Sequence, residues 1–170
     1  ITVRLNAAAP GNYTGNIAHA STNAATVNVG VSGNTINSDI PAGTNVIVAL
    51  DGSGNFTSIQ AAINAAPAGL TAPYIIYIKN GKYIEKVNIP SNKPFIQLIG
   101  QSAAKTIVSW ADNGINVGTF NSYTVYVAAN DCALMNLTIE NSYGDGSQGV
   151  ALRTDGDRII VHSCRIIGNQ

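Results

Sequence analysis

Residues 95–110, FIQLIGQSAAKTIVSW, hold two short apolar segments, 95–99 and 106–110, on either side of a polar turn. Segments like the first begin again 30 and then 25 residues later, at positions 125 and 150. Segments like the second begin again 31 and then 27 residues later, at positions 137 and 164. Two interleaved series in one range of period predict the coils of a solenoid, each giving one strand to each of two faces.

One segment has the pattern of a helix. Thr57 and Ser58 are N-cap residue types, and Pro67 ends the segment. The apolar positions between them share one helix face and are Ile59, Ala62, Ile63 and Ala66. A β-sandwich also repeats strands at regular intervals, but it explains neither this lone helix nor the two registers of similar length. We therefore predict an all-β fold, a right-handed parallel β-helix with one short N-terminal helix that caps the first coil.

The chain divides into two regions by composition. Residues 1–44 form an extension rich in Asn, Ala, Thr and Gly, with an alternating segment at 25–31 that suits a strand. Residues 45–170 carry the regular pattern and are expected to form the first coils of the β-helix. Further strands are expected at 46–50, 74–78, 83–89, 125–128, 134–139, 150–153 and 159–167.

The composition limits the function. In 170 residues, 9 Lys and Arg balance 9 Asp and Glu, and only 11% of residues are charged. This balance argues against nucleic-acid binding and against a polybasic membrane surface. No apolar run approaches the roughly 18 residues of a membrane span. The excess of 21 Ile and 13 Val over 7 Leu favours strands. Cys132 and Cys164 have no metal-ligand spacing, and either a disulfide or two free thiols suits them.

Four motifs occur in order along residues 45–170. They are DGSGNFTSIQAA at 51–62, GKYIE at 81–85, TFNSYT at 119–124 and QGVALR at 148–153. Together they resemble the pectin methylesterases, or pectinesterases, the carbohydrate esterases that remove methyl groups from homogalacturonan. The first 44 residues match nothing in the core of that family.

The resemblance implies a cleft in which one carboxylate attacks the methyl-ester carbonyl and side-chain amides stabilise the oxyanion. A second carboxylic acid protonates the departing methanol and then acts as a base toward water. Gln148 matches the first oxyanion amide and also a substrate contact. Gln170 matches the second amide. Thr119 and Phe120 match positions that line the substrate cleft. The family's acid Asp, nucleophilic Asp and orienting Arg would fall after Gln170, so this stretch is expected to be the N-terminal part of a catalytic domain and inactive alone.

The other polar candidates have structural interpretations. Asp155 and Asp157 suit a turn between strands rather than the missing catalytic pair. Arg153 is expected to form an ion pair or hydrogen bonds across coils. Glu85 is expected to support coil packing, and His162, on an apolar strand, to be a hydrogen-bonded structural residue.

The resulting prediction is a secreted, monomeric pectinesterase that acts on pectin of the cell wall without metal or other cofactor, nucleic acid or membrane. Two alternatives remain. A pectate lyase-type β-helix enzyme would use Ca²⁺ and an Arg to eliminate rather than hydrolyse. A non-catalytic β-solenoid would bind polysaccharide or act as an adhesin, and the low charge suits it.

Overall fold

The computed structural model describes residues 11–20, 22–23, 25–35 and 40–168. The chain divides into two compact units, Ile1–Ile40 and Pro41–Gln170. Among the helices in these described ranges, none is long and apolar enough to cross a membrane.

The first unit contains an antiparallel hairpin. Its strands β1 (Gly11–His19) and β2 (Val27–Thr35) pair along their whole length. The sequence predicts a strand at 25–31, which overlaps β2, but it does not predict β1. The β1 segment, GNYTGNIAH, contains two Gly and two Asn, residue types that are depleted in strands. Pairing with β2 supplies the order that the local pattern of β1 lacks.

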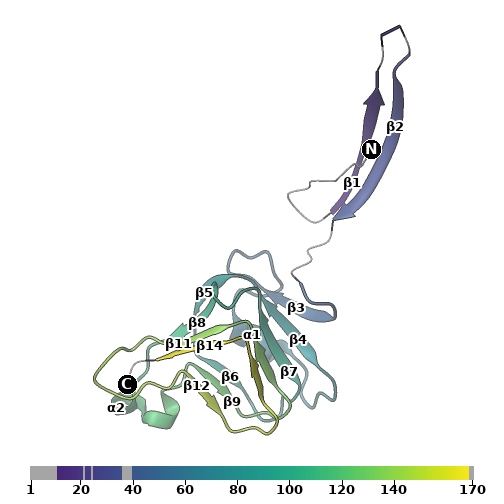
Figure 1. The fold of residues 1–170 in the computed structure, drawn as a ribbon. Helices are drawn as coiled ribbons and strands as arrows, with labels where there is room; N and C mark the ends of the chain where they lie inside the picture. Colours follow the sequence, from purple (N-terminus) through teal and green to yellow (C-terminus); the bar gives the residue numbers. More distant parts are fainter. Residues whose placement is uncertain (1–10, 21, 24, 36–39, 169–170) are drawn as a thin grey trace. The chain divides into compact units, whose positions relative to one another are not determined.

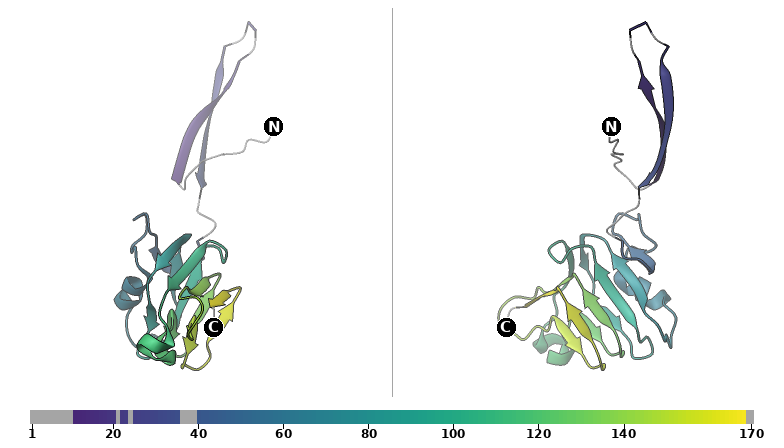
Figure 2. Two further views of the ribbon diagram at one scale, coloured as in Figure 1. Left: turned by 90° about the vertical axis from the view of Figure 1, so that its left-hand side faces the viewer. Right: turned by 45° about the vertical axis from the view of Figure 1, so that its right-hand side comes forward.

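The second unit is a parallel β-helix built from three sheets, whose strands are all paired in parallel. The first sheet contains, in spatial order, β13 (Ile160–His162), β10 (Ala133–Met135), β7 (Ile96–Gly100), β4 (Tyr74–Ile78) and β3 (Thr44–Val48). The second contains β14 (Arg165–Gly168), β11 (Thr138–Asn141), β8 (Thr106–Trp110) and β5 (Gly81–Ile84). The third contains β12 (Leu152–Thr154), β9 (Val125–Val127) and β6 (Val87–Ile89). Figures 1 and 2 show successive coils stacked within this unit.

The prediction of a β-helix is confirmed, but the prediction of two faces is wrong. The series at 106, 137 and 164 stays within the second sheet, as β8, β11 and β14. The series at 95, 125 and 150 mixes β7 of the first sheet with β9 and β12 of the third. The cause is unequal coil length, because the first-sheet strands β4, β7, β10 and β13 begin at 74, 96, 133 and 160. The coil that starts with β7 contains a long loop, so the regular spacing of the segments at 95, 125 and 150 does not reflect which strands stack on one another.

Three predicted strands are each divided into two by a corner. The segment 83–89 contains part of β5 and all of β6, 134–139 contains parts of β10 and β11, and 159–167 contains β13 and part of β14. At two of these corners, Asn136 and Ser163 each have φ of 53°. A single left-handed residue turns the chain without a Gly or Pro, so the apolar pattern shows no break.

The predicted helix is confirmed as α1 (Ile59–Ala65). Ser58 is its N-cap, and its hydroxyl accepts a hydrogen bond of 3.2 Å from the Ala61 amide. Ile59, Ala62 and Ile63 are fully buried in the same core as the strands. The helix therefore covers apolar surface of the coils, as its amphipathic pattern requires.

Candidate active site

Two neighbouring loops form the candidate site, each connecting the second sheet to the third. The loop at 111–124 contains α2 (Gly114–Val117) and the short helix η1 (Thr119–Asn121), which the sequence does not predict because they are so short. The loop at 142–151 follows one coil later. The Gly114 amide donates to the Gln148 carbonyl at 2.7 Å, and the Thr124 amide donates to the Val150 carbonyl at 3.0 Å. Stacking of coils thus brings the two loops together.

Thr119 and Gln148, both predicted as site residues, meet where these loops touch. The Thr119 hydroxyl donates a hydrogen bond of 3.3 Å to Oε1 of Gln148. Among the described residues, none accepts a hydrogen bond from Nε2 of Gln148. The exposed Gln148 side chain therefore has one end fixed and keeps an N–H₂ group available for a ligand.

Surface hollows lie beside Gln148. One has a volume of about 300 Å³ and is lined by Thr119, Gln148, Gly149, Val150, Ala151, Ile166 and Gly168. A second, of about 420 Å³, is lined by Ile115, Gly146, Ser147 and Gln148. Among the described residues that line the two hollows, no side chain is charged. Their polar groups are hydroxyls, amides and the backbone, so these surfaces suit a neutral polar ligand.

Phe120, the third predicted residue, is 74% exposed and stands next to Arg153. The Arg153 guanidinium lies 5.6 Å from the Phe120 ring centre and 4.6 Å from that of Tyr126, and its Nη1 donates to the Phe120 carbonyl at 3.2 Å. Asp155 forms an ion pair with Arg153 and accepts from the Tyr126 hydroxyl at 2.8 Å. These bonds, that from Arg153 foremost, lower the pKa of Asp155. Arg153 thus pairs with Asp155 two residues away and reaches the neighbouring coil through the Phe120 carbonyl, and this second contact is of the kind that the sequence predicts for Arg153.

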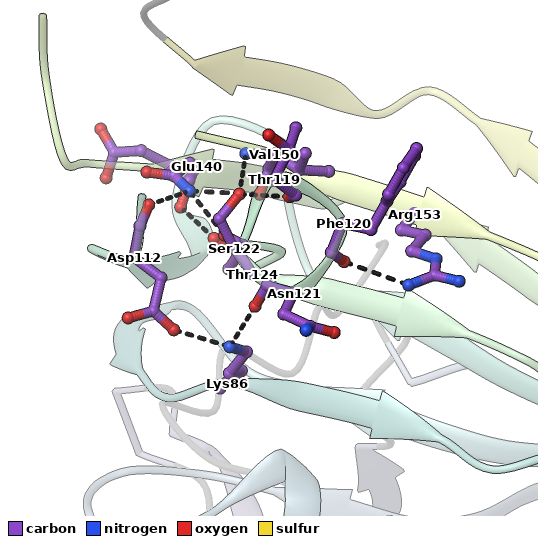
Figure 3. Close-up of polar contacts among 11 residues, drawn as sticks. Lys86, Asp112, Thr119, Phe120, Asn121, Ser122, Thr124, Glu140, Val150 and Arg153 are labelled. Atoms are coloured by element: carbon purple, nitrogen blue, oxygen red, sulfur yellow. Dashed lines mark hydrogen bonds and ion pairs between the residues drawn. The ribbon is translucent and has the colours of Figure 1, made fainter. Parts of the chain in front are cut away.

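Lys86 and Asp112 tie the first loop to the coil beneath it, and the sequence gives no signal for either. Lys86 Nζ lies 2.6 Å from Asp112 Oδ2 and donates to the Asn121 carbonyl at 2.6 Å (Figure 3). The same Nζ lies 4.5 Å from the centre of the Tyr123 ring. The Lys86 ammonium holds the pKa of Asp112 below its usual value. Both partners of this clamp are polar residues in otherwise ordinary turns, so only the fold identifies them.

The remaining candidates lie elsewhere or outside the described residues. Gln170 falls outside them, so its predicted role as the second amide stays a prediction. Glu85 accepts hydrogen bonds from Ser58 and from two amides at the start of α1, as its predicted structural role requires. His162 is exposed, with Nδ1 3.1 Å from the hydroxyl of Ser163. Cys132 and Cys164 are free thiols.

No metal-binding cluster occurs in the part of the chain that the structure describes, where no group of three His, Cys, Asp or Glu side chains gathers. Asp157, the other turn carboxylate, belongs to the corner before β13, where its amide donates to the Asn130 side chain at 2.9 Å. Among the described residues, the side chains that line the two hollows offer amide and hydroxyl groups and no carboxylate.

Comparison with known proteins gives one family. A family model described as Pectinesterase matches residues 45–170. Probable pectinesterase/pectinesterase inhibitor 23 of Arabidopsis thaliana is 41% identical over 133 residues, which cover 76% of this chain and 23% of the relative. Probable pectinesterase 56 of the same plant is 40% identical over 123 residues, which cover 71% of this chain and 43% of the relative.

Solved structures agree with the sequence relatives. The pectin methylesterase from carrot superposes with a TM-score of 0.71 at 35% identity, over 74% of this chain and 40% of that one. A pectin methylesterase solved in complex with hexasaccharide VII superposes with a TM-score of 0.65 at 27% identity, over 74% of this chain and 45% of that one. The chain therefore spans less than half the length of each of these proteins.

Proposed function

The chain belongs to the pectinesterase family, and on that premise we propose that its cleft binds methyl-esterified homogalacturonan for hydrolysis of the methyl esters, with release of methanol. The observation that carries the proposal is the Gln148 amide, whose Oε1 accepts from Thr119 while no described residue accepts from Nε2, beside a hollow whose described lining side chains are uncharged. A fully esterified galacturonate unit is itself uncharged, which suits that lining.

Gln148 acts as an oxyanion donor in this proposal. Attack of a carboxylate oxygen on the ester carbonyl carbon forms a tetrahedral centre and moves the carbonyl electron pair onto oxygen. Donation from Nε2 stabilises that oxygen without adding a competing charge. Collapse of the centre breaks the bond to the methoxy oxygen, which leaves as methanol after protonation, and water then hydrolyses the acyl intermediate. Gln170 is proposed as the second donor.

Thr119 and Phe120 bind the sugar in this proposal. Thr119 lines the same hollow as Gln148 and fixes the direction of its amide. Phe120 offers an exposed aromatic ring, and such rings pack against the apolar C–H faces of sugars. We also propose that the protein is secreted, acts as a monomer on cell-wall pectin and needs no cofactor.

The 170-residue polypeptide is proposed to bind this substrate without turning it over. Three carboxylates around the loops already have cationic partners: Asp112 is paired with Lys86, Glu140 with Lys82, and Asp155 with Arg153. The pKa of each is held below its usual value by its partner, so each is a stabilised anion and a weak nucleophile.

The test is the affinity of the polypeptide for a fully methyl-esterified hexagalacturonate, measured by calorimetry together with an assay for methanol. We expect binding, no methanol, and a loss of affinity of about tenfold in Gln148→Ala, which removes hydrogen bonding to the ligand. Asn92→Ala is the matched control, because Asn92 is an exposed amide in the turn between β6 and β7. Equal affinity in all three proteins contradicts the role of Gln148. Unsaturated products formed with Ca²⁺ would indicate the lyase chemistry instead.

A further inference from the structure

Asn141, the last residue of β11, lies between the two loops of the candidate site and is only 4% exposed. Its Nδ2 lies within hydrogen-bonding distance of three backbone carbonyls, those of Ser122 at 2.8 Å, Asp112 at 2.9 Å and Val150 at 3.2 Å. Figure 3 shows these three residues converging from both loops. One buried amide thus bonds both loops that carry Thr119 and Gln148.

The direction of the Asn141 amide is fixed from its other end. Oδ1 accepts a hydrogen bond of 3.1 Å from the Tyr143 amide. The nitrogen must therefore face the three carbonyls, and its two hydrogens are shared among them. Buried carbonyls without a donor are costly, so these contacts hold the loop backbones where they are.

Ser122 extends the network to the predicted site residues. This fully buried hydroxyl donates to the Thr119 carbonyl at 2.6 Å and accepts from the Val150 amide at 3.1 Å. Asn141 holds the carbonyl of the same Ser122. A short chain of bonds therefore runs from Asn141 to the backbone of Thr119, and another reaches Val150, two residues after Gln148.

The residue that follows Gln148 packs directly against Asn141. A Cβ at Gly149 would lie 2.8 Å from Oδ1, 2.9 Å from Cγ and 3.0 Å from Nδ2 of Asn141. Real Cβ atoms essentially never approach this closely, so the contact requires glycine. The backbone next to Gln148 therefore packs against the Asn141 side chain at Gly149 and accepts a hydrogen bond from it at the Val150 carbonyl.

We propose that Asn141 is a positioning residue of the cleft, whose buried amide sets the relative position of Thr119 and Gln148. The expected effect of Asn141 on substrate affinity rests on the proposed function, since the position of Gln148 affects binding only if Gln148 contacts the substrate. The claim that Asn141 holds one loop against the other does not depend on any ligand.

The first readout is amide hydrogen exchange of the unliganded polypeptide. In Asn141→Ala, we expect exchange to quicken by about 10- to 100-fold at Gly114 and Val150, whose amides bond the opposite loop. Amides of β4 serve as the internal reference. A merely structural role would quicken exchange in β4 to the same extent. Unchanged exchange at Gly114 and Val150, or an equal change in β4, overturns the proposal.

The second readout is affinity for the fully methyl-esterified hexagalacturonate as a function of pH. This ligand has no carboxyl group to titrate. In Asn141→Asp, a carboxylate would face three carbonyls at neutral pH, so affinity should fall at least about tenfold and recover partly in acid, where a protonated carboxyl donates one hydrogen bond. In Asn141→Ala the loss should persist at every pH. Affinity of Asn141→Asp that follows the wild-type pH profile overturns the proposal.

Two controls keep the outcomes separate. Asn130→Ala removes an inter-coil bond from the Asp157 amide, at the corner between β9 and β10, and should leave the affinity unchanged. If Asn141→Ala does not fold, Asn141→Asp at neutral pH supplies the same comparison, because it keeps the shape of the side chain but removes the donating N–H₂ group. A wild-type polypeptide that binds no hexagalacturonate would contradict the proposed function, and the exchange measurement would still decide the positioning role of Asn141.

Discussion

The Thr119 hydroxyl and the Gln148 amide, 29 residues apart in sequence, form a hydrogen bond of 3.3 Å across two neighbouring coils. The bond occupies Oε1 of Gln148, and no described residue accepts a hydrogen bond from Nε2. Because an oxyanion needs a donor and repels an acceptor, the orientation of this amide matters for the proposed chemistry.

Replacing Thr119 by Val should weaken binding of the fully methyl-esterified hexagalacturonate by about three- to tenfold, the effect of one hydrogen bond. Valine keeps the shape but lacks the donor, so the Gln148 amide is free to rotate. Thr119→Ser keeps the hydroxyl and should bind within about twofold of wild type. Calorimetric titration of the three proteins checks this, and equal affinity of the Val and Ser variants would contradict the orienting role.

Replacing Arg153 by Met should reduce the same affinity by about three- to tenfold, because the Phe120 carbonyl and ring lose their support. Exposed ion pairs contribute little to folding, so the free energy of unfolding should change by less than about 1 kcal/mol. Arg153→Lys keeps the charge without the planar fork and should restore only part of the affinity. A large loss of stability without loss of affinity would show that Arg153 has a structural role alone.

Replacing Glu85 by Ala should lower the free energy of unfolding by about 2 kcal/mol. The carboxylate accepts from the Ile59 amide at 2.8 Å, the Gln60 amide at 3.0 Å and the Ser58 hydroxyl at 2.7 Å, all at the start of α1. Urea unfolding measures the loss. Glu85→Gln should be intermediate, since an amide oxygen can accept only some of these bonds. A loss below about 0.5 kcal/mol in the Ala variant would mean that Glu85 does not hold the helix.

Because Tyr83 is buried, we expect the protein to lose stability in alkali. Its hydroxyl donates to the Lys79 carbonyl at 2.9 Å, and burial raises its pKa to about 12, against 10.0 for an ordinary tyrosine. A raised pKa stabilises the folded state fully below pH 10, and this stabilisation is lost as the pH rises from 10 towards 12. The difference in unfolding free energy between wild type and Tyr83→Phe should therefore shrink over this range. A difference that stays constant would show that Tyr83 ionises alike in both states.

Local patterns in the sequence predict the helix α1 and most strands of the second unit, but not β1. The choice of Thr119 and Gln148 as site residues comes from the family resemblance of their motifs. Contacts between coils are harder to predict, because the spacing of partners depends on loop length. Lys86 and Asp112 are 26 residues apart and Asn141 and Asp112 are 29 apart, in coils whose lengths differ. The same variation gives the false series at 95, 125 and 150. Corners such as Asn136 are equally hidden, because a left-handed Asn leaves the apolar pattern intact.

The most direct test of the account is nuclear magnetic resonance of the polypeptide with ¹⁵N-labelled glutamine side chains, titrated with fully methyl-esterified hexagalacturonate. The Gln60 amide is an internal reference, since its Nε2 already donates to Asn64 and to the Asn88 carbonyl. The account predicts a saturable shift of the Gln148 side-chain resonances and none at Gln60. Binding of the hexasaccharide without any change at Gln148 would contradict it.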